Sequence, residues 1–365
     1  MSPDEVVLVT GGTGAIGIPL VESLALDGAE VVVLARGVSP AAPPGVRVVR
    51  GDILGGDTLG MESGVLAAVQ ARVTTIIHAA ALTRFDAPLE AVRAVNVEGT
   101  RNLLSLAGGC GRLRRVCALS TVYVAGKRTG PIFESDLDHD CGFVNAYERS
   151  KYEAEQVVRE AMGRLPIAVF RLSTVIGDSK SGAVGRLAAI HHAIRFLYQS
   201  LLPMMPGAPD TPVDLIATDY AIAAVRHLSG SGFVPGRTFH ICAGADAVPQ
   251  GELIDLAIDA FVRYRPAWRR RAIEKPALVE LDTFELFRQS VEAVADSALR
   301  ASVAVLAPFA PQLGYPKVFD DGACAAMLDP AGIARPPIRD TIMNAVQYLV
   351  ESNWGSRAGA DRGSA

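Results

Sequence analysis

Short runs of valine, isoleucine and leucine recur along the first two-thirds of the chain, and helical patterns separate them. The runs occupy residues 6–10, 30–34, 46–50, 75–78, 115–119 and 167–171. Near-continuous apolar runs of this length are typical of strands that are buried on both faces. Because strands and helices alternate, the pattern predicts an α/β fold with a Rossmann-type, doubly wound parallel sheet.

The pattern changes after about residue 180. Prolines and glycines crowd residues 203–212, an apolar run returns at 238–242, and residues 250–350 have a mostly helical pattern. This change predicts a smaller, mostly helical second part that builds the substrate side of the cleft. The expected parts are a Rossmann domain over 1–180 with returning elements at about 213–245, a mostly helical substrate-binding region over 181–355 and a flexible tail over 356–365.

Composition excludes several classes of protein. The chain has 365 residues and a net charge of −4, which gives no sign of a nucleic-acid surface. Its five cysteines lack CxxC or CxxH spacing, so we expect neither a disulfide framework nor a metal site. No signal peptide pattern precedes the first strand, and no uncharged apolar run reaches about 18 residues. We therefore expect a cytoplasmic protein without a membrane span.

A glycine-rich loop follows the first strand and opens a helix expected over residues 14–27. Gly11, Gly14 and Gly17 have the spacing GxxGxxG, which permits a tight turn and lets the backbone approach a pyrophosphate. The N-terminus of the helix offers free N–H groups to that anion. An ordinary strand-to-helix turn is the alternative. The loop residues expected to bind a dinucleotide are Gly11, Thr13, Gly14, Ala15, Ile16 and Gly17.

The end of the second strand distinguishes between two cofactors. An acidic residue there would bind the ribose 2′-OH of NAD, but the chain reads Val33-Leu34-Ala35-Arg36-Gly37. Arg36 could instead pair with the 2′-phosphate of NADPH, because a guanidinium forms bidentate contacts with phosphate. The alternative is a solvated arginine at the end of a strand. We expect NADPH.

Further cofactor contacts are expected where later strands end. Asp52 and Ile53 follow the third strand, where the adenine should lie, although Asp52 could instead serve a turn or a cap. Ala79 and Ala80 follow the fourth strand and are small enough for a close approach to the cofactor, whereas His78 reads as a packed structural histidine. Asn96 lies in a helical segment, where it either bridges backbone groups beneath the site or has a structural role only.

Tyr147 and Lys151 are the strongest candidates for chemistry. They are four residues apart, so they share one face of a helix. A lysine ammonium beside a tyrosine favours the phenolate and makes the phenol a better proton donor or acceptor near neutral pH. Ser120 and Thr121 offer hydroxyl groups upstream. Together with the glycine loop, these residues predict a hydride-transfer enzyme.

These residues resemble the extended short-chain dehydrogenase/reductase superfamily over about residues 5–245. The matching segments are GGTGAIG at 11–17, HAAA at 78–81, VNVEGTRNLL at 95–104, STVYVAG at 120–126 and YERSK at 147–151. A narrower resemblance, to fatty acyl reductases and thioester reductase domains, rests on NAYERSKYEAE at 145–155 and RLSTVIGDSKSG at 171–182.

The resemblance implies a role for each site residue. Thr121 would hydrogen-bond the substrate carbonyl oxygen, Tyr147 would protonate it, and Lys151 would lower the tyrosine pKa and hold the nicotinamide ribose. The nicotinamide would lie against Leu172 and Ser173. The implied reaction is NADPH-dependent reduction of an acyl thioester, bound to CoA or to a carrier protein, to an aldehyde or alcohol. The implied oligomeric state is a monomer or homodimer.

Three other functions remain open on sequence grounds. The same site could reduce a small ketone or aldehyde or oxidise an alcohol, it could epimerise a nucleotide sugar with bound NAD, or the fold could serve as a non-catalytic nucleotide sensor. A carrier-protein partner would fit a basic cluster, although a solvated helix face is the simpler interpretation of it. The cluster consists of Arg263, Arg265, Arg269, Arg270 and Arg271.

Overall fold

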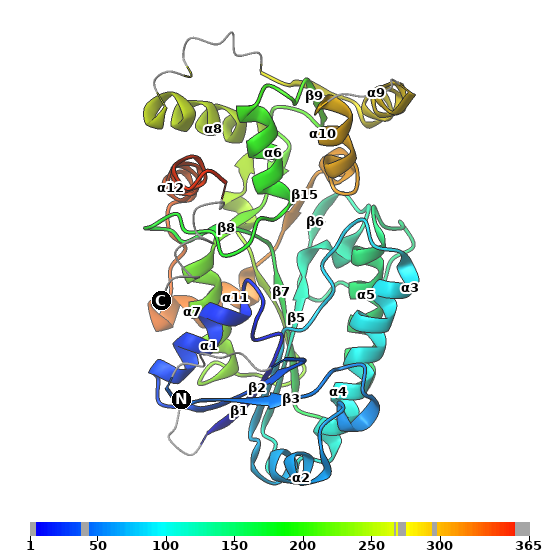
Figure 1. Ribbon diagram of the computed structural model, residues 1–365, viewed down its shortest axis with the longest axis vertical. Coiled ribbons are helices and arrows are strands. Elements are labelled where there is room, and N and C mark those ends of the chain that lie inside the picture. Colours follow the sequence, from blue (N-terminus) through cyan, green and yellow to red (C-terminus); the bar gives the residue numbers. More distant parts are fainter. Residues whose placement is uncertain (1–4, 38–43, 266–267, 269–274, 294–297, 355–365) are drawn as a thin grey trace.

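Seven strands form one parallel sheet at the centre of the protein (Figure 1). The computed structural model describes residues 5–37, 44–265, 268, 275–293 and 298–354. The sheet order is β12-β7-β5-β4-β1-β2-β3, and every neighbouring pair is parallel. The strands are β1 (Val6–Thr10), β2 (Glu30–Ala35), β3 (Val46–Arg50), β4 (Thr75–His78), β5 (Arg115–Thr121), β7 (Ile167–Leu172) and β12 (Thr238–Ile241).

The sheet confirms the predicted α/β class and the predicted strands. Both faces of β1 are buried: Val7 and Val9 belong to one core, and Val6 and Leu8 belong to another. Figure 1 shows α1, α7 and α11 on one side of the sheet and α3, α4 and α5 on the other. These helices are α1 (Gly17–Leu26), α3 (Leu89–Arg93), α4 (Gly99–Gly108), α5 (Ala146–Ala161), α7 (Thr218–Ser229) and α11 (Gly322–Leu328); a further helix, α2 (Ser63–Arg72), lies between β3 and β4 in the chain.

Helix α1 begins three residues later than the sequence suggested. The expected start was Gly14, but the residues before Gly17 form turns in which the Gly14 N–H donates to the Gly11 carbonyl at 3.0 Å. Gly11 has φ +72°, a conformation that glycine adopts without strain. The loop therefore forms a hydrogen-bonded turn before the helix starts.

A second group of helices lies beyond one end of the sheet, in the upper half of Figure 1. It has its own apolar core, to which Ile194, Ala257 and Val346 belong. The helices are α6 (Ala189–Tyr198), α8 (Gln250–Tyr264), α9 (Leu281–Ala293), α10 (Ala298–Leu306) and α12 (Ile338–Glu351). None of the described helices is long and apolar enough to cross a lipid bilayer.

Four pairs of short strands form separate two-stranded sheets outside the main sheet, and the sequence pattern did not predict them. Strands of two to four residues are too short to show a period in the sequence. The pairs are β15 (Lys317–Phe319) with β6 (Gly130–Ile132), β11 (Leu215–Ala217) with β8 (Thr174–Gly177), β14 (Ala277–Val279) with β9 (Met204–Pro206), and β10 (Pro212–Val213) with β13 (Val248–Pro249).

Short helical turns complete the described chain. The π-helical turn Ala94–Glu98 joins α3 to α4. The 3-10 turns are Gly56–Thr58, Val122–Ala125, Gly244–Asp246, Ala310–Gly314 and Asp329–Ala331.

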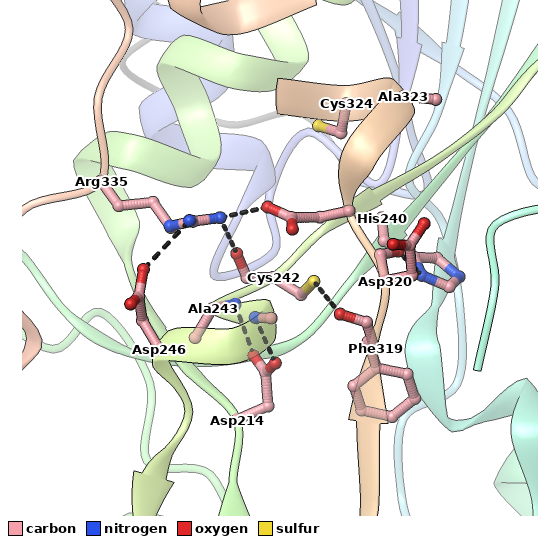
Figure 2. A network of polar contacts seen from close by, with 12 residues as sticks. Asp214, His240, Cys242, Ala243, Asp246, Phe319, Asp320, Ala323, Cys324 and Arg335 are labelled. Atoms are coloured by element: carbon pink, nitrogen blue, oxygen red, sulfur yellow. Dashed lines mark hydrogen bonds and ion pairs between the residues drawn. The ribbon is translucent and has the colours of Figure 1, made fainter. Parts of the chain in front are cut away.

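Buried carboxylates fix the C-terminal segment to the edge of the sheet. Figure 2 shows Asp214 accepting hydrogen bonds from the backbone N–H groups of Ala243, at 2.8 Å, and Gly244, at 3.0 Å. Arg335 forms ion pairs with Asp246 and Asp321 (Figure 2). Asp214 is buried, so its two hydrogen bonds fix the loop after β12, and the more exposed Arg335 pairs link this loop to the residue before α11.

A second buried carboxylate joins three elements. Glu134 accepts hydrogen bonds from the backbone N–H groups of His240 on β12 and of Ala323 and Cys324 on α11. Removal of this side chain would leave three buried donors without an acceptor, a costly change. Glu134 therefore fixes α11 to the edge strand β12 of the sheet.

Candidate active site

The glycine loop is closely packed against the end of β4. A Cβ atom at Gly11 would lie 2.5 Å from the backbone of Ala79 and of Ala80, and one at Gly17 would lie 2.0 Å from the Gly11 carbonyl oxygen. The loop lies at the carboxyl end of β1, between β4 and β2, where the direction of strand addition reverses. Open α/β sheets bind ligands in the crevice at this point.

The geometry of the loop fits a dinucleotide. The helix α1 starts directly behind the loop, so its free N–H groups face the same crevice. Thr13 and Ala15 at the tip are exposed, Gly14 and Ile16 are half-buried, and Gly17 is buried beneath them. The residues expected from the sequence therefore form a single backbone cradle of the kind that holds a pyrophosphate.

Arg36 and Asp52 lie at neighbouring strand ends. Arg36 is exposed immediately after β2, and no described residue forms an ion pair with it. One carboxylate oxygen of Asp52 accepts the Leu54 N–H at 3.0 Å, so the turn role considered for Asp52 is present. Ile53 is buried against Gly99 at the start of α4.

The end of β4 is fixed by a buried histidine. His78 Nδ1 is 2.7 Å from the Thr10 hydroxyl, and its Nε2 is 3.1 Å from the Thr100 hydroxyl. Burial, with a smaller effect from the Lys151 charge, lowers the pKa of His78 to about 3. His78 is therefore a neutral packing residue, as the sequence suggested, and it holds the strand that ends at Ala79 and Ala80.

Asn96 connects the loop after β4 with α5. Its Oδ1 accepts the Leu82 N–H at 2.8 Å, and its Nδ2 donates to the Leu82 carbonyl at 3.1 Å and to the Ser150 hydroxyl at 2.9 Å. The π-helical turn in which Asn96 lies places this side chain beneath the site, and such turns are frequent at functional sites. Asn96 thus bridges backbone groups under the crevice.

The structure distinguishes Thr121 from its neighbour. The Ser120 hydroxyl donates to buried Glu155 at 2.9 Å, so it is engaged away from the crevice. Thr121 ends β5 opposite Leu172 of β7, and its hydroxyl hydrogen-bonds the phenol of Tyr147. Strand alternation explains the difference, since successive side chains point to opposite faces.

Tyr147 and Lys151 lie on the first turns of α5, but their electrostatics differ from the expectation. Burial, strengthened by the neighbouring Glu148 charge, raises the pKa of Tyr147, and the hydrogen bond to Thr121 offsets this only in part. Lys151 donates to the Leu119 carbonyl at 2.8 Å, and burial lowers its pKa to about 8. The structure thus corrects the expectation that Lys151 lowers the tyrosine pKa: Tyr147 keeps its proton at neutral pH.

Leu172 and Ser173 end the adjacent strand at the same edge. Leu172 is buried, and the Ser173 hydroxyl donates to the Asp214 carbonyl at 2.8 Å. Ser173 N–H also donates to the Ile241 carbonyl of β12 at 3.0 Å. The sheet therefore brings Leu172 and Ser173 to the crevice beside Thr121.

An apolar cavity begins beside these residues, and the sequence did not predict it. Phe85, Tyr123, Thr174 and Glu148 line the end of the cavity that lies nearest to Tyr147, and the cavity holds about 140 Å³. The Phe85 ring packs edge-on against the Tyr147 ring with 5.3 Å between centroids. Phe85 follows β4 by only seven residues, but no periodic signal marks it.

A polar network also borders the cavity. Glu148 is buried and accepts hydrogen bonds from the Val144 N–H and from Asn145 Nδ2, at 3.0 and 3.1 Å. Lys317 donates to Gln312 Oε1 at 2.7 Å. Burial raises the pKa of Glu148 to about 7 and lowers the pKa of Lys317 to about 8, and each charge partly offsets the effect on the other. Asn145 and Glu148 have the spacing of a helix-capping pair, which the sequence could have revealed.

With this geometry in place, similarity to known proteins can be assessed. Residues 41–225, just over half of the chain, match the NAD-binding family described as male sterility protein. The chain belongs to this family. It is an oxidoreductase of the extended short-chain dehydrogenase/reductase type, related to thioester reductases, and its fold binds a nicotinamide cofactor.

Individual relatives support the same family assignment. The chain is 29% identical to the glycine betaine reductase of Emericella nidulans over 64% of its own length and 21% of that protein. It is 28% identical to the carboxylic acid reductase of Segniliparus rugosus, over 70% of its length and 25% of that protein. The chain thus spans between a fifth and a quarter of these two relatives.

Among solved structures, the terminal R domain from the myxalamid PKS-NRPS biosynthetic pathway is similar over almost the whole fold. The TM-score is 0.80 and the sequence identity 26%, with 96% of this chain and 91% of that domain covered. The similarity includes the helical part beyond residue 250, where the sequence showed little resemblance to known families.

Proposed function

We propose that this protein reduces an acyl thioester, carried by CoA or a carrier protein, with NADPH as the hydride donor. The observation that supports this most strongly is the position of Tyr147, whose phenol lies near Thr121 at the end of β5 and whose ring packs edge-on against Phe85, a residue that lines the apolar cavity. A reductase of this kind needs a dinucleotide on one side of its proton donor and an acyl group on the other. The glycine loop and Thr121 follow strand ends at the same edge of the sheet, and Phe85 beside Tyr147 lines the cavity.

In the proposed mechanism, the bound dinucleotide supplies a hydride to the acyl carbon. Thr121 and Tyr147 hydrogen-bond the carbonyl oxygen as negative charge develops on it, which is the main source of rate in such sites. Tyr147 transfers its proton to that oxygen and gives a hemithioacetal. The carbon–sulfur bond then breaks, the hydroxyl proton is released, and the sulfur leaves as a thiol. One hydride and one proton are consumed for each aldehyde formed.

The high pKa of Tyr147 suits this direction of reaction, because the phenol must be protonated when the carbonyl is reduced. Lys151 is the cation within the buried site, and its proton can replace the one that Tyr147 gives up. Asn96 and His78 would not react. They position the strand and helix that carry the reacting groups.

The choice of NADPH rests on Arg36, which is exposed and without an ion-pair partner among the described residues. The proposal for a carrier-bound substrate rests on the relatives, whose names include reductases and synthetase subunits. Arg269, Arg270 and Arg271 of the basic cluster lie outside the described residues. Arg263 stacks on the Tyr264 ring, and Arg265 donates to the Val350 carbonyl.

The test is NADPH oxidation by the purified protein with three substrates side by side. These are an acyl thioester of pantetheine, the matching free aldehyde, and a UDP-hexose. We expect oxidation with the thioester and release of a thiol that is detectable with a disulfide reagent. Oxidation with the aldehyde alone would instead assign a simple carbonyl reductase, and conversion of the UDP-hexose without net NADPH oxidation would assign an epimerase.

A further inference from the structure

The cavity beside Tyr147 continues deep into the helical part. Its walls run from Phe85 and Tyr123 near the reacting groups to α6 and α8, which pack against each other. Ala193 of α6 and Ala257 of α8 contribute small side chains to these walls, and both are almost completely buried. The cavity therefore connects the proposed reaction centre with a gap between two helices.

An aromatic cluster lies on the same two helices, one turn beyond the alanines. Tyr198 of α6 packs against Phe261 of α8 with 5.0 Å between ring centroids, and Trp268 contacts both rings. None of these three rings lines the cavity. Ile194 and Leu197 of α6 and Ile254 of α8 also line the cavity, so Ala193 and Ala257 are the small residues that leave room for a bound chain between the two helices.

Most polar groups in the walls are already paired, and Gln312 Nε2 is a buried neutral donor without a hydrogen-bond partner among the described residues. Glu148 accepts from Val144 and Asn145, and Gln250 uses its Nε2 to donate to the Pro206 carbonyl at 3.1 Å. The Gln250 Oε1 is buried and has no hydrogen-bond partner among the described residues. No lysine, arginine or histidine is among the described residues that line the cavity. A negative charge would therefore be buried here without a charged partner, which is strongly unfavourable.

We propose that Ala193 and Ala257 determine the length of the acyl chain that this enzyme accepts, and that the chain is aliphatic and uncharged at its far end. The inference rests on the proposed thioester reduction and adds the substrate class. Each buried methylene contributes roughly 0.8 kcal/mol, or about a fourfold gain in kcat/KM, until the chain reaches the helices. A chain that ends in a carboxylate does not gain this increase in kcat/KM, because the charged group would lose its hydrating water in the apolar cavity.

The experiment measures kcat/KM with pantetheine thioesters of straight acyl chains from four to twelve carbons, and with one ω-carboxyacyl thioester of the optimal length. Wild type is compared with Ala257→Leu and Ala193→Leu. Leucine adds three carbons to alanine, so we expect each variant to prefer a chain shorter by about three carbons, with little change for the four-carbon substrate. The carboxylated chain should be at least a hundredfold poorer than its neutral counterpart.

Ala260→Leu is the matched control, because Ala260 is completely buried on the same helix but does not line the cavity. Any decrease in kcat/KM in this variant should be the same for substrates of every chain length. If the leucine variants do not fold, Ala257→Gly provides a second test, since removal of the methyl group should move the preference toward longer chains. Folding is followed by urea unfolding of each variant.

Two results would overturn the proposal: an unchanged chain-length preference in folded variants at positions 193 and 257, or equal reduction of the neutral and carboxylated chains. In either case thioester reduction itself would stand. By contrast, NADPH that is not oxidised with a thioester of any length would refute the proposed function, so the two failures are distinguishable.

Discussion

The cofactor side and the substrate side of the crevice are built in opposite ways. The cradle is made of backbone: a seven-residue loop, one strand end packed 2.5 Å from where a Cβ would be, and a helix N-terminus. The cavity is made of side chains from segments that lie between residues 85 and 313. The cradle is thus specified by residues adjacent in sequence, whereas the cavity exists only because distant helices pack together.

This difference affects how each side tolerates substitution. A backbone cradle fails when a single Cβ is added, because no rotamer can avoid a clash with the main chain. A side-chain cavity changes its shape and therefore its specificity, while the surrounding helices stay in place. Tyr147 packs against the cavity residue Phe85, and substitutions at Tyr147, in the loop and around the cavity separate the contributions of the two sides.

The largest expected effect is at Tyr147 itself. We expect Tyr147→Phe to reduce kcat about 10²–10⁴-fold, because the reaction loses its proton donor. The phenyl ring still packs against Phe85, so both sides of the crevice remain formed. The measurement pairs single-turnover kinetics with a fluorescence titration of NADPH, whose affinity should stay within a few-fold. Near-normal turnover in this variant would refute the proposed mechanism.

The next effect tests the backbone cradle. Gly17→Ala would place a Cβ 2.0 Å from the Gly11 carbonyl oxygen, so the loop must move. We expect loss of NADPH binding and destabilisation by about 1–3 kcal/mol in urea unfolding.

Gly64→Ala in α2 is the control, because a Cβ there meets nothing within 4 Å. It should stabilise the protein by about 0.5–1 kcal/mol and leave NADPH binding unchanged. Equal cofactor affinity in both variants would show that the loop does not form the cradle.

A third prediction concerns the polar network on the substrate side. The pKa of Glu148 is raised to about 7, above its ordinary value of 4.5, so the folded state holds this proton more tightly than the unfolded state. Its stabilising effect is complete below pH 4.5 and is lost as pH rises toward 7. Glu148→Gln cannot titrate, so we expect the stability difference between wild type and variant to be largest near pH 5.

The measurement is urea unfolding of both proteins from pH 5 to pH 7, a range in which Lys317, with a pKa of about 8, stays protonated. The difference should shrink by about 1.4 kcal/mol for each unit that separates the folded and unfolded pKa values. A difference that stays constant with pH would mean that Glu148 does not titrate in this range.

The smallest effect is expected at Arg36, which lies at the rim of the cradle. Arg36→Ala removes a charged hydrogen bond to the 2′-phosphate, worth about 1.5–3 kcal/mol, so NADPH should bind roughly tenfold or more weakly. NADH lacks this phosphate, and its affinity should hardly change. Equal losses for both cofactors in a titration would leave Arg36 without a role in cofactor choice.

The sequence by itself determined the sheet and the cofactor loop. The main strands, six of them from the first two-thirds and β12 later, lie within two residues of their predicted bounds, because strands buried on both faces require unbroken apolar runs. The glycines of the loop could be recognised in the sequence for a similar reason. Few residues other than glycine can adopt a positive φ and also allow a close contact between two backbone segments. Both constraints act on residues that are close together in the chain, so both appear as short patterns in the sequence.

Only the tertiary structure decided the rest of the site. It directs the Ser120 hydroxyl to Glu155 and the Thr121 hydroxyl to Tyr147. It also buries Tyr147, which raises the pKa of a phenol for which the sequence suggested a lowered pKa. It also paired two- to four-residue strands across the chain and opened a cavity between α6 and α8. Burial depends on everything packed around a group, and a cavity depends on which helices meet. Neither can be inferred from the spacing of nearby residues, which is why the sequence predicted the strands and the glycine loop but not the cavity.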